Sequence, residues 1–326
     1  MDLRPLDELE QIERYRTLFT DAAFWAPYVK EACARHGLAG APVRAGVPGT
    51  YPAFIAGERW LVKFFGRLFD GQASFEAERE AGRLAALDPA IPTARVVASG
   101  ELGGAGWPWP YLIFEYIPGE SIGQARDRLS AADRLRAARM LGDAVRRIHA
   151  LPLAGSPVFP RDHAAYRRFL EAQRTACVEV QRARGALPER LVAQIEAFMP
   201  PVEALVDDGY PPHLIHADLT ADHLLGRGKT GHWKGLALID FGDAMTGSLY
   251  YELAALHLDL FGGDRRMLAA FLAAYGLPAA ALADLPRRAL ATALLHRFDV
   301  FQAVPRALLQ AQTLDELAYT LWGQPG

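Results

Sequence analysis

Two aspartates, Asp218 and Asp240, carry the clearest chemical signal in this sequence. Asp218 lies in LIHADLTADHLL (residues 214–225) and Asp240 in LALIDFGDA (residues 236–244), and both stand beside apolar residues that predict buried strand. Phosphoryl transfer uses one carboxylate to accept the proton of the attacking hydroxyl and another to hold Mg²⁺. The two aspartates therefore predict a site for phosphoryl transfer.

Each aspartate motif also has a simpler interpretation. His216 stands two residues before Asp218 and would brace the loop through hydrogen bonds, but a histidine and an aspartate at this spacing occur by chance in many proteins. The carboxylate of Asp240 suits Mg²⁺, which prefers oxygen ligands, yet an aspartate here would also cap a turn before Gly242. The prediction therefore depends on whether other segments supply the remaining parts of such a site.

Lys63 is the candidate cation for the phosphates. It lies in WLVKFF (residues 60–65), an otherwise apolar run that predicts a strand, and the chain contains only four lysines. The alternative is an edge-strand lysine whose stem packs on the sheet while its amine reaches water.

A lysine in such a site needs a carboxylate to hold it, and the helix predicted after this strand offers Glu76, Glu78 and Glu80. Glu80 is the predicted partner, because Leu84 and Leu87, four and seven residues later, are expected to face the core. Glu78 is expected to point away from that face. The alternative for all three is a solvated helix face.

Composition and charge narrow the class of protein. The chain has 326 residues, 51% of them hydrophobic, and a net charge of −3, so neither nucleic acid nor an anionic membrane is expected as a partner. The first residues mix acids with bases and predict neither a secretion signal nor an anchor, and no apolar run approaches the roughly 18 residues of a membrane span. Cys33 and Cys177 fit no metal-ligand pattern, which predicts reduced thiols and a cytoplasmic location.

The first third of the chain predicts an antiparallel sheet that carries one important helix. A leading helix is expected over residues 20–38, with Thr20 as N-cap and Gly37 as its stop, and a second over residues 74–89 with Ser74 as a cap. Short apolar runs predict strands over residues 51–55, 60–65, 95–99 and 111–116.

The rest of the chain is mainly helical. Ser130 and Asp133 form a capping box at the start of a helix over residues 129–151, whose apolar stripe predicts a central position. A hairpin is expected where the two aspartate segments meet, around residues 226–231. We therefore predict an α+β fold with a small lobe over residues 1–116 and a larger helical lobe over residues 117–326. Further helices are expected over residues 164–182, 188–198, 250–261, 264–275 and 286–304.

The order of these parts resembles the protein-kinase-like superfamily, in which a strand lysine, a helix glutamate and two aspartate motifs follow one another. Lys63, Glu80, Asp218 and Asp240 fill these positions. The chain has no G-x-G-x-x-G-x-V before the lysine, only AGVPGTYPAF (residues 45–54), and no A-P-E follows the second aspartate. With H-A-D in place of H-R-D, it resembles the aminoglycoside phosphotransferases, whose members phosphorylate small molecules.

Further phrases make the chain similar to the hygromycin B 7″-O-kinases, and the resemblance spans nearly its whole length. It implies antibiotic resistance as the role, a small amino-alcohol as the substrate and ATP with Mg²⁺ as cofactors. The phrases are FWAP (residues 24–27), WPWPYL (107–112), HLDLFGGDRRML (257–268), LLHRFDVF (294–301) and LWG (321–323).

The resemblance also implies where the nucleotide binds. Main-chain groups of Glu115 and Ile117, in the segment that joins the lobes, would hold the adenine. The loop around Gly49 and Thr50 would cover the phosphates with backbone N–H groups. Lys63 would contact the α- and β-phosphates.

His223 departs from the family pattern, which places an asparagine at this position for the second metal ion. An imidazole there would weaken binding of Mg²⁺ or favour Mn²⁺, and the neighbouring Asp222 could compensate. Alternatively, His223 hydrogen-bonds Asp218 or a backbone carbonyl.

The acceptor site is the least constrained part of the prediction. An acceptor with amines requires carboxylates, although solvated helix charges are the alternative for each candidate. Trp107, Trp109 and Trp322 are expected to pack in the core rather than stack on a sugar. A kinase of another small hydroxylated metabolite, or a pseudoenzyme that binds nucleotide without transfer, stays open, and the oligomeric state is unknown. The candidate carboxylates are Asp243, Glu252, Asp259, Asp264 and Asp299.

Overall fold

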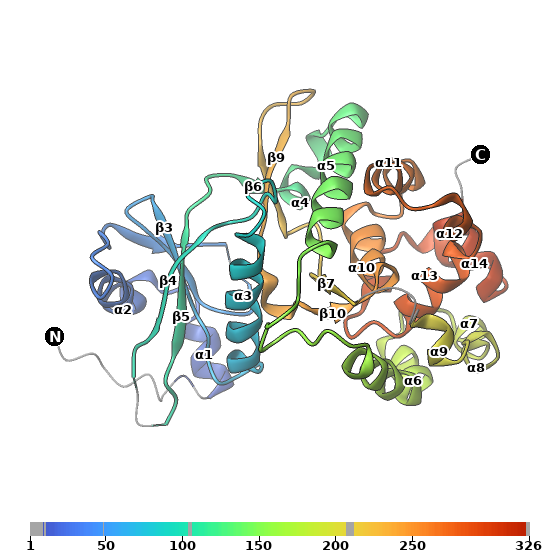
Figure 1. Cartoon of the computed structure of the whole chain (residues 1–326), viewed down its shortest axis with the longest axis horizontal. Coiled ribbons are helices and arrows are strands. Elements are labelled where there is room, and N and C mark those ends of the chain that lie inside the picture. The colour runs from blue at the N-terminus through green and yellow to red at the C-terminus, as the bar shows by residue number, and fades with distance from the viewer. Residues whose placement is uncertain (1–8, 10, 48, 104–105, 207–211, 324–326) are drawn as a thin grey trace. The chain divides into compact units, whose positions relative to one another are not determined.

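The computed structural model describes residue 9 and residues 11–47, 49–103, 106–206 and 212–323. The first eight residues, expected to hold no signal or anchor, and Pro48 of the predicted phosphate loop lie outside this part of the chain. Two compact units are formed (Figure 1): the first comprises Met1–Leu87, Thr93–Pro118 and Ala237–Asp243, and the second comprises Asp88–Pro92, Gly119–Leu236 and Ala244–Gly326. Asp240 therefore belongs to the same unit as Lys63.

The first unit is built on a five-stranded antiparallel sheet in the order β1-β2-β3-β5-β4. Four strands were predicted within one or two residues of their ends. The short first strand was missed, because three residues give too little alternation to recognise. The strands are β1 Val43–Ala45, β2 Ala53–Ala56, β3 Trp60–Phe64, β4 Val96–Glu101 and β5 Pro110–Glu115.

Alternation along β3 decides which way Lys63 points. Val62 and Phe64 pack into the apolar core that contains Trp25, on the face that α2 covers. Lys63 pairs in register with Leu112, which packs with Phe75 of α3 on the other face. Because successive side chains of a strand point to opposite faces, Lys63 lies on the α3 side of the sheet. Figure 1 shows α2 and α3 on the two faces of this sheet.

Three helices complete the first unit: α1 Ile12–Leu18, α2 Ala22–Ala34 and α3 Gly71–Ala85. Asp21, not the predicted Thr20, caps α2 by accepting the N–H groups of Ala23 and Phe24. Pro27 lies inside α2 without ending it. The third helix begins at Gly71, three residues before the predicted cap Ser74, and ends at Ala85.

A long central helix, α5 Ala131–His149, organises the second unit. Its capping box of Ser130 and Asp133 is confirmed. The helix packs against α11 Arg265–Tyr275 so closely that a Cβ on Gly142 would lie 2.4 Å from the carbonyl oxygen of Phe271. Only glycine permits this approach of two backbones.

Short strands frame the two aspartate segments. The strand β7 His213–Ile215 precedes Asp218 and pairs with β10 Met245–Gly247. The predicted hairpin is present as β8 Leu224–Arg227 and β9 Lys234–Leu238, with β6 Glu120–Ser121 on the other side of β8.

The remaining helices follow the predicted spans, with two interruptions. Residues 188–198 form two single turns, and the segment expected as one helix over residues 286–304 breaks after Leu294, so that LLHRFDVF becomes a connecting loop. The α+β fold class is confirmed. Among the described residues, no helix is both long and apolar enough to cross a membrane. Helical elements of the second unit not yet given are α4 Ile122–Ala125, the 3₁₀ turn Arg126–Arg128, α6 Ala164–Arg184, α7 Glu189–Val192, α8 Ile195–Phe198, α9 Val202–Leu205, α10 Leu249–Ala255 with a π-helical extension Leu256–Leu260, α12 Ala279–Ala283, α13 Leu285–Leu294, the 3₁₀ turns Val300–Ala303 and Arg306–Gln310, and α14 Leu314–Trp322. The 3₁₀ turn Phe241–Asp243 belongs to the first unit.

Candidate active site

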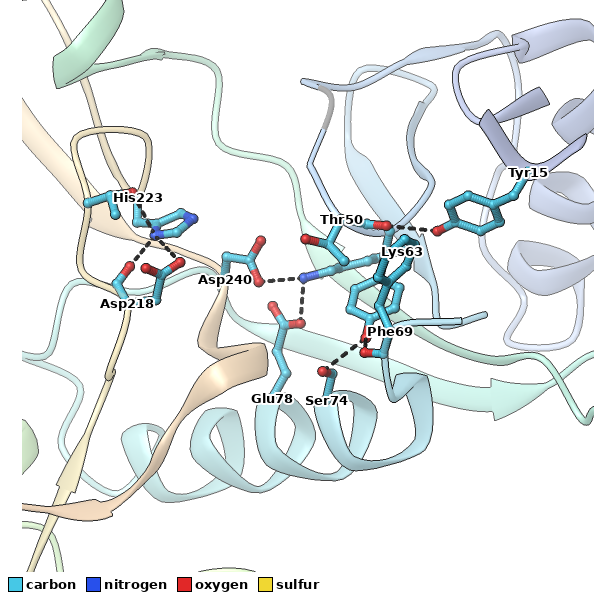
Figure 2. Close-up of polar contacts among 11 residues, drawn as sticks. Tyr15, Thr50, Lys63, Phe69, Ser74, Glu78, Asp218, His223 and Asp240 are labelled. Carbon is cyan, nitrogen blue, oxygen red and sulfur yellow. Dashed lines mark hydrogen bonds and ion pairs between the residues drawn. The ribbon is translucent and has the colours of Figure 1, made fainter. Parts of the chain in front are cut away.

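Lys63 holds two carboxylates at once. Its Nζ donates to Oε2 of Glu78 and to Oδ1 of Asp240, each at 2.7 Å (Figure 2). Lys63 and Glu78 are buried, whereas the side chain of Asp240 is 34% exposed. The lysine is therefore not the snorkelling edge-strand residue of the alternative interpretation.

The electrostatics of this cluster keep Lys63 charged. Burial alone lowers the pKa of an amine, but the negative charges of Asp240 and Glu78 and the two hydrogen bonds outweigh that effect and raise the pKa of Lys63 above its ordinary value. A permanently charged ammonium at this position is suited to a phosphate oxygen.

The prediction that Glu80 is the carboxylate partner of Lys63 is wrong, because Glu78 takes this position. Glu80 instead forms a bidentate pair with Arg83 on its own helix, at 2.7 Å for both bonds. Glu80 is buried together with Leu84, as predicted, but Leu87 lies beyond the end of α3 and is 57% exposed. The buried face includes Phe75 and Glu78, three residues apart on successive turns.

The segment around Asp240 is anchored in the first unit. Leu238 forms a parallel bridge with Thr93, and the turn that follows Asp240 packs on α3. Asp240 has a φ of 65°, a left-handed conformation that few residues other than glycine adopt. Its Oδ2 lies 3.9 Å from the position of a Cβ added to Gly49, so the predicted phosphate loop and the carboxylate are close together.

The predicted adenine contacts remain predictions. The Glu115 side chain is exposed and pairs with Arg95 at 2.5 Å, while its backbone N–H donates to the Arg95 carbonyl. The side chain and the backbone N–H of Glu115 are therefore both engaged within the first unit.

In the second unit, the loop that carries Asp218 is folded around His223. The Nδ1 of His223 lies 2.5 Å from the carbonyl oxygen of Asp218 and 3.2 Å from Oγ1 of Thr220 (Figure 2). The His216 and His223 rings stack, with centroids 5.3 Å apart. His223 thus makes the backbone hydrogen bond of the second interpretation, and because this bond occupies Nδ1, only Nε2 is left as a metal ligand.

Ala217, immediately before Asp218, is held by two buried polar side chains that sequence reasoning did not assign to this task. Its N–H donates to Oε2 of Glu252 at 3.0 Å, and its carbonyl accepts from Nε2 of His296 at 3.1 Å. Nε2 is the donor because Nδ1 of His296 accepts the N–H of Phe298. Since Ala217 has a φ of 64°, these two contacts stabilise a conformation that alanine disfavours.

Burial shifts the pKa of both side chains that contact Ala217. Burial lowers the pKa of His296 to about 3, so the ring is neutral. Burial also raises the pKa of Glu252 to about 7; the N–H groups of Ala217 and His216 act in the opposite direction, and the charge of Asp218 raises it further. The neutral histidine requires no counter-ion in the core.

These contacts correct part of the predicted acceptor site. The prediction of Glu252 as an acceptor ligand is wrong, because Glu252 is a buried residue of α10 whose carboxylate accepts the N–H of Ala217. Asp259 uses Oδ1 to accept the N–H of Ala221 at 2.7 Å. Asp264 caps α11 and pairs with Arg266. Asp243 is half-buried in the turn after Asp240, and its role stays a prediction.

Asp299 is different from the other candidate carboxylates. Its Oδ1 is buried and has no hydrogen-bond partner among the described residues. It lies in the LLHRFDVF loop, three residues after His296. Trp109 and Trp322, by contrast, are buried core residues, as predicted.

The residues present fit a magnesium ion only in part. The Asp240 carboxylate offers the oxygen ligand that Mg²⁺ prefers, and such ions commonly take one or two carboxylates together with substrate phosphates. His223 offers a nitrogen in place of the usual amide oxygen. Asp240 is thus the better supported metal ligand of the two.

Comparison with known proteins identifies the family. The model of the phosphotransferase enzyme family, APH, matches residues 53–291, which include Lys63, Glu78, Asp218 and Asp240. The chain belongs to this phosphotransferase enzyme family. Its fold is kinase-like.

Solved structures share the fold at low sequence identity. The GDP and kanamycin complex of APH(2″)-IIIa superposes with a TM-score of 0.63 and 19% identity, covering 83% of this chain and 88% of that one. A thermostable mutant of the aminoglycoside phosphotransferase APH(4)-Ia, in complex with ADP and hygromycin B, gives a TM-score of 0.56 and 17% identity over 90% of this chain and 98% of that one.

A curated relative matches over a shorter stretch. The lysine-specific demethylase JMJ21 of Arabidopsis thaliana is 25% identical over 207 residues, which are 52% of this chain and 22% of that protein. The chain therefore spans about a fifth of the length of this relative.

Proposed function

We propose that the protein transfers the γ-phosphate of ATP to a hydroxyl of an aminoglycoside or aminocyclitol such as hygromycin B. The observation that carries the proposal is the buried ammonium of Lys63 between Glu78 and Asp240, in a chain of the phosphotransferase family. Glu78 orients Lys63 toward the phosphates, and Asp240 binds the metal ion that neutralises them.

In the proposed reaction, Asp218 accepts the proton of the acceptor hydroxyl. The hydroxyl oxygen forms a bond to the γ-phosphorus while the bond from that phosphorus to the β–γ bridging oxygen breaks, and ADP leaves with the electron pair. Bound Mg²⁺ would stabilise charge on the phosphate oxygens. Glu252 and His296 fix the backbone of Ala217, so that the base is held in one position before the acceptor arrives.

Asp299 supports an amine-bearing acceptor. A buried carboxylate oxygen without a partner among the described residues is costly unless a ligand supplies a donor, and an ammonium group of an aminoglycoside is such a donor. The adjacent Phe298 is 38% exposed and offers an apolar surface beside that carboxylate. Solved relatives with this fold contain kanamycin or hygromycin B together with a nucleotide.

Mass spectrometry tests the proposal directly. The protein is incubated with ATP or GTP, Mg²⁺ or Mn²⁺, and a panel of hygromycin B, kanamycin and simple amino-alcohols, and each acceptor is examined for one added phosphate. We expect phosphorylation of hygromycin B, lost in Asp218→Asn. Nucleotide binding without a phosphorylated product from any acceptor would instead favour a pseudoenzyme.

A matched pair of variants tests the acceptor assignment. Asp299→Asn should raise KM for the acceptor and leave KM for the nucleotide unchanged. Asp315→Asn is the control, because Asp315 is an exposed aspartate of the same unit that pairs with Arg287. Equal acceptor KM values in both variants would remove Asp299 from the acceptor site.

A further inference from the structure

The predicted phosphate loop has an anchor that lies outside the kinase motifs. Tyr15, on helix α1, donates its hydroxyl to the carbonyl oxygen of Thr50 at 2.8 Å (Figure 2). Tyr15 is buried, and its ring packs near Phe19 and Phe69. Burial, followed by the nearby Tyr51, raises the pKa of Tyr15, so its hydroxyl stays protonated and remains a donor.

A second tyrosine ties the same loop to helix α3. The hydroxyl of Tyr51 donates to the carbonyl oxygen of Phe69 at 2.5 Å and lies 3.0 Å from Oγ of Ser74. Ser74 stands one helical turn before Glu78, the residue that holds Lys63. Tyr51 also places its ring 5.7 Å from Nζ of Lys63. The loop is thus connected on one side to α1 and on the other to the element that positions the lysine.

The backbone that leads into α3 leaves little freedom for this second connection. Phe69 and Asp70 both adopt positive φ, at 63° and 59°. A Cβ on Gly71 would lie 1.9 Å from the carbonyl oxygen of Gly66, so no other residue fits there without displacing the backbone. The carbonyl that Tyr51 contacts therefore belongs to a tightly constrained turn.

The direction of the Thr50 carbonyl matters for an anion. The peptide bond between Thr50 and Tyr51 is trans, so the carbonyl oxygen of Thr50 and the N–H of Tyr51 point to opposite sides. A hydrogen bond to Tyr15 holds the electronegative oxygen toward α1 and turns the N–H away from α1. Backbone N–H groups of such loops bind phosphate oxygens, whereas carbonyl oxygens repel them.

We propose that Tyr15 is a positioning residue for the nucleotide phosphates: α1 fixes the peptide between Thr50 and Tyr51 with its N–H side available to the phosphate chain. This inference rests on the proposed nucleotide-binding function. Helix α1 would thereby take part in binding the nucleotide, because it orients a loop that lacks the G-x-G-x-x-G-x-V pattern.

Calorimetric titration with ADP and with adenosine, in the presence of Mg²⁺, tests the proposal. Tyr15→Phe removes only the hydroxyl. We expect its affinity for ADP to fall about two- to twelvefold, the range for the loss of one neutral hydrogen bond, while its affinity for adenosine is unchanged. Tyr51→Phe should shift the same ratio in the same direction.

Tyr111→Phe is the matched control. Tyr111 is a buried tyrosine of the same unit whose hydroxyl contacts Nε2 of His36 at 3.1 Å, away from the loop. Its ratio of ADP to adenosine affinity should equal that of the wild type, even if its melting temperature falls as much as that of Tyr15→Phe.

The outcomes separate the two proposals. If the wild type binds ADP and Tyr15→Phe binds ADP equally well, or loses ADP and adenosine affinity in the same proportion, the role of Tyr15 is refuted. If the wild type binds no nucleotide, the proposed function itself fails, and this inference fails with it.

Discussion

Replacing Glu78 of helix α3 by alanine, with Glu80→Ala as the comparison, is the sharpest test of the site geometry. In Glu78→Ala, Lys63 loses a charge-assisted hydrogen bond of 2.7 Å within a buried pair but keeps the equally short bond to Asp240. Hydrogen bonds to charged groups contribute about 1.5–3 kcal/mol, and the remaining bond to Asp240 limits any further loss. If this energy serves to position Lys63 in the transition state, kcat/KM should fall about 10- to 150-fold.

Glu80→Ala is the control, since it removes a carboxylate two residues away on the same helix. Glu80 pairs with Arg83 instead of with Lys63; the Glu80 side chain is 8% exposed and that of Arg83 is 54% exposed. We expect kcat/KM of Glu80→Ala to stay within about threefold of the wild type. Steady-state kinetics with varied nucleotide measure both variants, and circular dichroism verifies that both are folded. A larger rate loss in Glu80→Ala than in Glu78→Ala would refute the assignment of Glu78.

Three further predictions concern the loop that carries Asp218 and the residues that contact it. Because burial raises the pKa of Glu252 to about 7, protonated Glu252 stabilises the folded state fully below the ordinary pKa of 4.5, and this contribution declines as pH rises toward 7. The free energy of unfolding of the wild type relative to Glu252→Gln should therefore fall by about 1.4 kcal/mol per pH unit across that interval in urea titrations; a constant difference would contradict it. His223→Asn should preserve activity and shift metal preference toward Mg²⁺ in assays with each ion, and an inactive, well-folded variant would argue against this. Asp218→Asn should strongly reduce kcat while calorimetry finds nucleotide affinity nearly unchanged, and a comparable loss of nucleotide affinity would exclude a role limited to the acceptor.

Local patterns were sufficient to predict four of the five strands of the first sheet and the lysine. The apolar run WLVKFF indicated a strand, and the scarcity of lysine drew attention to Lys63, which lies on the α3 side of the sheet. The capping box at Ser130 is a similarly local signal, because its two hydrogen bonds join residues three apart.

The carboxylate partner of Lys63 was harder to predict. Helix α3 buries residues on more than one face, and the sequence does not say which of these faces meets the strand that carries Lys63. Phe75 and Glu78 lie on the face that packs against the sheet, whereas Glu80 is buried on a different face together with Leu84. Phe75 was the available signal, since an aromatic residue usually marks the buried face.

Residues that act through the backbone of another segment were beyond the reach of sequence reasoning. His296 contacts the carbonyl of Ala217, 79 residues earlier, and Tyr15 contacts that of Thr50, 35 residues later. A backbone carbonyl is present at every position, so neither contact leaves a pattern of residue types. The tertiary fold alone brings these groups together.

We propose that Lys63, Asp240 and Asp218 act on one nucleotide during transfer. A crystal structure with a non-hydrolysable ATP analogue, Mg²⁺ and hygromycin B tests it most directly. We expect that Lys63 contacts the α- or β-phosphate and that Asp240 binds the metal ion. We also expect Asp218 to accept a hydrogen bond from the acceptor hydroxyl nearest the γ-phosphate. A nucleotide bound away from Lys63, or an acceptor with no hydroxyl near Asp218, would contradict it.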